Sequence, residues 1–142
     1  MNSAEMIKTK SPELNKKLLV AAQAGDLASA KEVLEQGAAV EASYAIGFTP
    51  LMLAAGKGYT DLVRLLLDAG AGIEARNKYG HTPLMLAAGN GHAETTRLLL
   101  DAGAAVDARD EGGRTPLMAA AENGHAETRR VLLDAGAAVE GS

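Results

Sequence analysis

The sequence contains a short segment that returns twice at a constant interval. Residues 49–56 read TPLMLAAG, residues 82–89 repeat this segment, and residues 115–122 read TPLMAAAE, so the interval is 33 residues both times. Over the full interval, residues 49–81 and 82–114 are identical at 20 of 33 positions. Similarity this dense at a fixed period indicates a repeat array, in which each unit buries a hydrophobic face against its neighbour.

The composition of the 142-residue chain favours small helices that pack closely. Hydrophobic residues make up 47%, but the aromatic ones are only one Phe and three Tyr, so we expect an aliphatic, alanine-rich core. Because cysteine is absent, disulfides, thiolate metal sites and cysteine nucleophiles are excluded. The net charge of −4 provides no large basic face for a phosphate backbone, so we expect no nucleic acid partner.

The sequence predicts neither a membrane span nor a secretion signal. No apolar run approaches the roughly 20 residues that a bilayer requires, so we expect no membrane partner. Residues 1–10 lack the apolar centre of a signal peptide. We therefore expect a cytoplasmic protein with a flexible tail at residues 1–10 and a single repeat domain at residues 11–142, whose units span about 11–48, 49–81, 82–114 and 115–142.

Each unit carries signals for two helices. The first helix is expected to begin at an N-cap threonine followed by proline, and to end about eight residues later at a glycine. The threonines are Thr49, Thr82 and Thr115, and the glycines are Gly58, Gly91 and Gly124. A second helix, such as residues 61–69, is expected to end at the next glycine of each unit. These glycines are Gly37, Gly70, Gly103 and Gly136. In the first unit, Ser11 and Asp26 are the expected caps.

These residues closely resemble ankyrin repeats. The resemblance rests on Gly-x-Thr-Pro-Leu, the Ala-Ala pair, Gly-His at residues 91–92 and 124–125, and Leu-Leu-Leu-Asp-Ala-Gly-Ala, and it covers about residues 14–139. It implies an all-α solenoid of four stacked helix–turn–helix repeats joined by β-turn fingers. It also implies protein–protein recognition through the fingers and the concave first helices, without catalysis and without a cofactor.

The chain departs from the family pattern at three positions of the repeat. Met52, Met85 and Met118 stand where the family commonly has His, so the usual polar link to the threonine is absent. Small residues stand where the family often has Asp, at Ala39, Gly72, Ala105 and Ala138. Acidic residues stand where the family often has an Asn that is hydroxylated, at Glu41, Glu74, Asp107 and Glu140, so that modification is not expected.

The candidate partner-binding residues lie in the connectors between units and at the variable ends of the first helices. They are Tyr44, Ile46, Phe48, Lys57, Lys78, Tyr79, His81, Asn90, Glu111, Arg114 and Asn123. Exposed aromatic residues and arginine are enriched at binding hot spots. An alternative is that the aromatic side chains pack on neighbouring connectors and stiffen the array. For Tyr44 and Phe48 both interpretations stay open, whereas for Tyr79 and Arg114 we favour binding.

The sequence offers no convincing catalytic or metal site. His92 and His125 occupy equivalent positions one unit apart, and stacked helices about 8–10 Å apart hold two imidazoles too far from a common ion. No nucleophile elbow, phosphate loop or His-Glu-x-x-His motif occurs. We therefore predict that the protein is not an enzyme.

Two other hypotheses about function remain open. The chain could be a consensus-like engineered scaffold, or a fragment of a longer array, with no dedicated partner. We expect a monomer, and the other hypothesis is that copies of the chain associate end to end through the last unit, where Arg129 stands at the position of Val63 and Thr96. Arg129 could serve as a polar cap, and a segment taken from a longer array would look similar.

Overall fold

The computed structural model describes residues 11–139. The expected tail at residues 1–10 lies outside the described residues, as does Glu140. The described part contains eight α-helices and no β-strand, which confirms the prediction of an all-α fold. The helices are α2 (Pro12–Ala24), α3 (Leu27–Glu35), α4 (Pro50–Lys57), α5 (Thr60–Asp68), α6 (Pro83–Gly89), α7 (Ala93–Asp101), α8 (Pro116–Glu122) and α9 (Ala126–Asp134).

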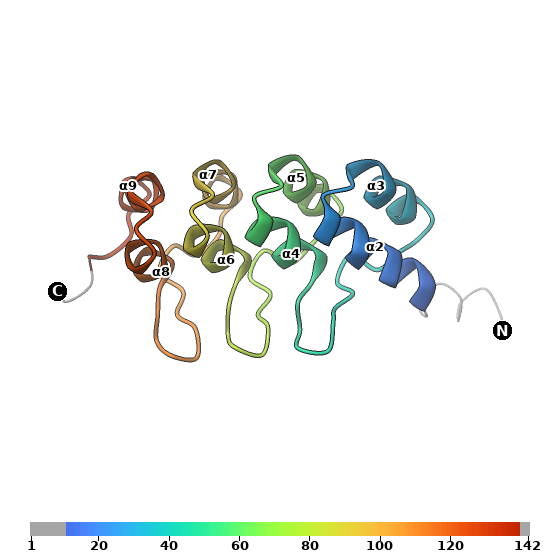
Figure 1. Ribbon diagram of the computed structural model, residues 1–142, viewed down its shortest axis with the longest axis horizontal. Helices are drawn as coiled ribbons and strands as arrows, with labels where there is room; N and C mark the ends of the chain where they lie inside the picture. Colours follow the sequence, from blue (N-terminus) through green and yellow to red (C-terminus); the bar gives the residue numbers. More distant parts are fainter. Residues whose placement is uncertain (1–10, 140–142) are drawn as a thin grey trace.

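The helices form two parallel rows along one axis (Figure 1). The first helices of the four pairs, α2, α4, α6 and α8, make one row, and each packs on the next one. The second helices, α3, α5, α7 and α9, make the other row. The three long connectors project on the side away from the second helices. The expected solenoid of stacked helix–turn–helix pairs is therefore confirmed.

The first helices begin at the threonines that the sequence indicated. The hydroxyl of Thr82, which is 1% exposed, accepts a hydrogen bond from the backbone N–H of Met85 at 3.3 Å. Thr49 and Thr115 form the same bond, and proline follows each of the three. This hydrogen bond satisfies a backbone N–H group in the first helical turn, which has no carbonyl partner within the helix. Ser11 and Asp26 also form their predicted caps.

A tight turn with glycine in the left-handed region joins the two helices of each pair. Gly58, Gly91 and Gly124 have φ values of 75°, 77° and 74°. The Asn-Gly pairs at residues 90–91 and 123–124 lie in these turns between helices. The turns place each second helix against the first helix of its own pair.

The core is aliphatic and rich in alanine, as the composition predicted. Leu51 and Leu66 are fully buried in the second pair, and the equivalent residues of the other pairs are also buried, all of them leucines except Val33. The alanine pair 54–55 is also fully buried, and its small side chains let neighbouring first helices approach closely. Burial therefore lies between units, so each pair depends on its neighbours for stability.

A carboxylate near the start of each connector binds the backbone of the next unit. The Oε2 atom of Glu41 accepts a hydrogen bond from the N–H of Gly72 at 2.9 Å. The other pairs are Glu74 with the N–H of Ala105 at 2.6 Å and Asp107 with the N–H of Ala138 at 3.1 Å. These bonds fix where each connector leaves the stack.

Candidate partner-binding surface

Each of the three connectors ends in a tight turn, which we call finger 1 (residues 44–48), finger 2 (residues 77–81) and finger 3 (residues 110–114). The three turns have the same backbone hydrogen bonds. In finger 2, the N–H of Asn77 donates to the carbonyl of His81 at 3.2 Å, and the N–H of Gly80 donates to the carbonyl of Asn77 at 3.0 Å. Fingers 1 and 3 form the two equivalent bonds. The backbone of the candidate surface therefore repeats even where its side chains differ.

Neighbouring fingers are also joined to each other. The N–H of Lys78 donates to the carbonyl of Ile46, and the N–H of Glu111 donates to the carbonyl of Tyr79, both at 3.0 Å. The approach is close, because a Cβ added to Gly80 would lie 2.8 Å from the backbone nitrogen of Glu111. The fingers thus form one continuous surface beside the row of first helices.

The side chain of the first residue in a finger determines which hydrogen bonds stabilise the turn. In finger 2 the Oδ1 atom of Asn77 accepts hydrogen bonds from the N–H groups of Tyr79 at 2.9 Å and His81 at 3.1 Å. Asp110 does the same in finger 3 for Gly112 and Arg114, both at 2.9 Å. In finger 1 the equivalent residue is Tyr44, whose hydroxyl instead lies 3.4 Å from Oε1 of Gln23 on α2.

The pKa of Asp110 reflects this arrangement. Partial burial of the carboxylate acts to raise its pKa, but hydrogen bonds from the N–H groups of Arg114 and Gly112 and the positive charges of His81 and Arg114 outweigh burial. The pKa of Asp110 is therefore lower than usual. Ionised Asp110 also lies 3.4 Å from Nε2 of His81, so it links finger 3 to finger 2.

Fingers 1 and 2 expose large apolar side chains. Tyr44 is 36% exposed, Ile46 is 40% exposed and Tyr79 is 50% exposed, whereas Phe48 is half-buried. Tyr79 is also in ring contact with His81 at a centroid distance of 5.8 Å. The structure therefore places these residues together but gives them two environments. Ile46 and Tyr79 are open to solvent, whereas Tyr44 reaches α2 and Phe48 is half-buried.

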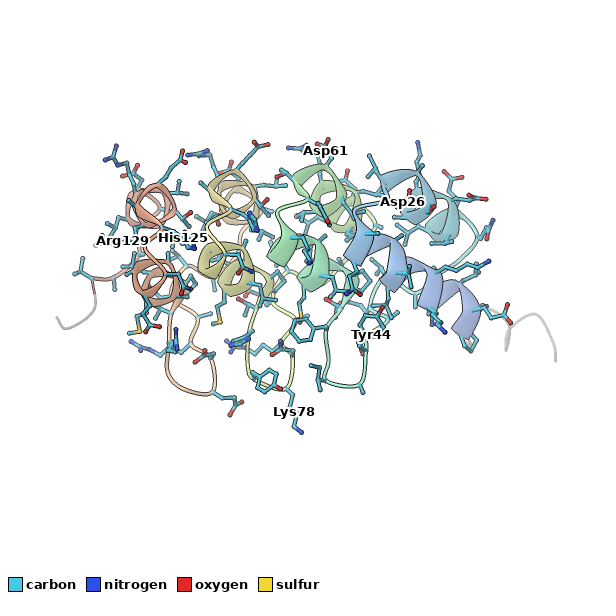
Figure 2. The ribbon with its side chains drawn as sticks, in the orientation of Figure 1. Asp26, Tyr44, Asp61, Lys78, His125 and Arg129 are labelled. Atoms are coloured by element: carbon cyan, nitrogen blue, oxygen red, sulfur yellow. The ribbon has the colours of Figure 1, made fainter. Side chains whose placement is uncertain are left out.

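The charged candidates lie at the ends of the fingers and at the edge of a groove. Lys78 projects from the end of finger 2, away from both rows of helices (Figure 2), and Glu111 is the equivalent exposed residue of finger 3. Arg114 forms an ion pair with Glu122 of α8. A groove of about 250 Å³ runs between fingers 2 and 3 and helices α6 and α8, and its lining residues include His81, Arg114 and Met85.

The three candidates at the ends of the first helices differ in their contacts. The side-chain amide of Asn90 donates to the carbonyl of Gly56 at 2.9 Å, and that of Asn123 donates to the carbonyl of Gly89 at 2.8 Å. Both asparagines are exposed and also join their unit to the preceding one. The side chain of Lys57 is exposed and forms no hydrogen bond or ion pair with residues 11–139. Partner binding by these three residues stays a prediction.

The histidines of the helix turns have structural contacts of a similar kind. Nε2 of His92 lies 2.9 Å from the carbonyl oxygen of Gly56, and Nε2 of His125 lies 3.1 Å from that of Gly89. Within the described part of the chain, no group of three or more His, Cys, Asp or Glu residues is placed to hold a metal ion. Across the same residues, no helix is both long and apolar enough to cross a membrane.

Gln23 and Glu122 also lie beside this surface, although they are not among the residues predicted from the sequence. Both occupy the repeat position of Gly56 and Gly89, so each adds a side chain where the two middle units have none. Gln23 contacts Tyr44, and Glu122 pairs with Arg114. Comparing the outer units with the middle ones at the 33-residue interval would have identified both residues.

Comparison with known families agrees with this architecture. A family model described as ankyrin repeats (3 copies) matches residues 18–110 and residues 69–141. The chain belongs to the ankyrin-repeat family. No curated protein matches the chain. Ankyrin repeats generally serve as protein–protein interaction modules and are typically non-catalytic.

Proposed function

We propose that this ankyrin-repeat protein binds a protein or peptide partner through the three fingers and the exposed ends of the first helices. The surface comprises the candidate residues of the fingers together with Lys57, Asn90 and Asn123. Binding needs no cofactor, and the protein does not act as an enzyme. We place this activity in the cytoplasm.

One observation carries the proposal. The three fingers share the same backbone hydrogen bonds, yet the residues at three of their positions differ completely from finger to finger. The equivalent sets are Ala45, Lys78 and Glu111; Ile46, Tyr79 and Gly112; and Phe48, His81 and Arg114. A constant backbone that presents different side chains, two of them large apolar groups left in solvent, is the arrangement expected of a recognition surface.

We infer that the binding unit is a monomer. Val63 and Thr96 are completely buried between units, whereas Arg129 holds the equivalent position on α9 and is exposed. A second copy stacked on this end in the same geometry would bury an arginine without a partner, which is strongly unfavourable. Light scattering at several protein concentrations would test this inference, since a rising mass would contradict it.

The experiment that tests partner binding is a quantitative pull-down from a cell lysate with three baits. The baits are the intact protein, the finger variant Ile46→Ser/Tyr79→Ser, and the control variant Leu133→Ser. Leu133 is 39% exposed on α9, so the control also removes an exposed apolar side chain but does so away from the fingers. All three baits are first shown to melt at similar temperatures.

A protein that the intact and control baits enrich, and that the finger variant loses, supports the proposal. Equal enrichment by all three baits would contradict the proposal, because the partner would then contact a surface other than the fingers. Failure of every bait to enrich a protein would favour the alternative of a scaffold with no dedicated partner.

A further inference from the structure

The two helix layers of this protein carry opposite net charges, although the whole chain is at −4. The first helices and the fingers contain five cations and four acidic residues, a net charge of +1. The cations are Lys16, Lys17, Lys57, Lys78 and Arg114, and the acidic residues are Glu13, Asp110, Glu111 and Glu122. The second helices contain five cations and eight acidic residues, a net charge of −3.

The positive charge of the binding layer is not spread evenly along the stack. Three of its four acidic residues belong to finger 3 and α8, where Glu122 already pairs with Arg114. Finger 1, α4, finger 2 and α6 contain no acidic residue. In this middle region, Lys57 and Lys78 are exposed and form no ion pair within residues 11–139. The middle of the surface is therefore positive and free to bind an anionic group.

The exposed apolar side chains lie in the same region. Ile46 and Tyr79 hold the same position on neighbouring fingers, and the backbone bond from Lys78 to Ile46 keeps those fingers together. Lys57 lies at the opposite end of α4 from finger 1, so a chain that touches both sites must span at least the helix length of about 12 Å. About four residues of extended peptide cover that distance.

We propose that the partner presents an extended acidic segment, in which an apolar side chain packs against Ile46 and Tyr79 and carboxylates approach Lys57 and Lys78. This inference rests on the proposed function and specifies the chemistry of its partner. A nucleic acid fits less well, because its phosphates continue at short regular intervals, whereas the cations of this layer give way to carboxylates at finger 3.

The test begins with selection of random linear peptides displayed on phage against the 142-residue chain. The expected result is enrichment of peptides that combine Asp or Glu with a large apolar residue. The most enriched peptide is then labelled, and its dissociation constant is measured by fluorescence polarisation. Oligothymidine is measured in parallel as the nucleic acid probe.

Two variants with the same change in net charge separate local from general electrostatics. Lys57→Glu/Lys78→Glu alters the binding layer, and Lys31→Glu/Arg97→Glu alters exposed residues of the second helices. We expect the first variant to weaken peptide binding by about tenfold or more and the control by less than about threefold, because exposed charges act mainly at short range. Raising the salt from about 0.1 M to about 1 M should weaken binding to the intact protein and reduce the difference between the two variants.

The remaining outcomes distinguish failure of this inference from failure of the proposed function. Enriched peptides without an excess of acidic residues would overturn the acidic partner while leaving peptide binding in place. Equal weakening of peptide binding by the two charge variants would also overturn the acidic partner and leave peptide binding in place. Tighter binding of oligothymidine than of any peptide would overturn the inference in favour of a nucleic acid. Failure to enrich any peptide would contradict the proposed function, and this inference with it.

Discussion

The turns between paired helices allow a direct test of how neighbouring units are held together. Gly91 and Gly124 occupy equivalent turns, with φ values of 77° and 74°. Alanine in this left-handed conformation costs about 1–2 kcal/mol at either position. The surroundings differ, because a Cβ on Gly91 would lie 2.5 Å from Nδ1 of His125, whereas a Cβ on Gly124 would meet no atom within 4 Å.

The difference between the two sites sets the expected magnitudes. In Gly91→Ala the ring of His125 must move, and its contact with the carbonyl of Gly89 at 3.1 Å is lost. One such hydrogen bond contributes about 1 kcal/mol, and disturbed packing adds to the loss. We therefore expect Gly124→Ala to lower the free energy of unfolding by about 1–2 kcal/mol and Gly91→Ala to lower it by about 2–4 kcal/mol.

Urea unfolding followed by circular dichroism gives both values by linear extrapolation. A double-mutant cycle with His125→Ala supplies the control. Once the imidazole is absent, Gly91→Ala should cost no more than Gly124→Ala. Equal costs of the two glycine substitutions in the presence of His125 would refute the idea that this ring packs over Gly91 and joins the two units.

Two further predictions concern stability. Thr82→Ala removes the hydroxyl that caps α6 and should lower the free energy of unfolding by about 1–2 kcal/mol in the same urea assay, and an unchanged value would contradict the capping role. The pKa of Asp110 is lower in the folded state, so its carboxylate stabilises the fold above about pH 4 and loses this effect as the pH falls through the folded-state pKa. Asp110→Asn should therefore flatten the fall in melting temperature below pH 4, and a melting curve that is equally pH-dependent in the variant would argue against it.

The sequence predicts the helices well because their ends depend on local chemistry. A threonine cap, a proline at the first helical position and a glycine that accepts positive φ each act within a few residues. The pair Thr82 and Gly91 shows this, since α6 begins just after the first and ends shortly before the second. The fixed interval then indicates that the pairs stack, because no single unit can bury its own apolar face.

Contacts between units are harder to predict. One partner is usually a backbone N–H or C=O group, and the residue type at that position does not indicate that the group forms such a contact. The differences among Lys57, Asn90 and Asn123 suggested a surface that meets a partner, yet the two asparagines also bond to carbonyl groups of the preceding unit. Glu41 is similar. Its sequence position indicated only that a family modification is absent, whereas in the fold its carboxylate holds the N–H of Gly72.

These double roles determine which residues can report on binding alone. A substitution at Asn90 removes a hydrogen bond to the neighbouring unit, so any loss of partner affinity would include an effect on stacking. Lys57 holds the same repeat position, and its side chain has no hydrogen bond or ion pair with residues 11–139. Lys78 projects from its finger, and its backbone is bound to Ile46. Changing the two lysine side chains should therefore alter the charge that a partner meets while leaving the stack intact. If Lys57→Glu/Lys78→Glu lowered the melting temperature as much as Asn90→Ala, these lysines would also stabilise the array, and their effect on binding could no longer be assigned to direct contact.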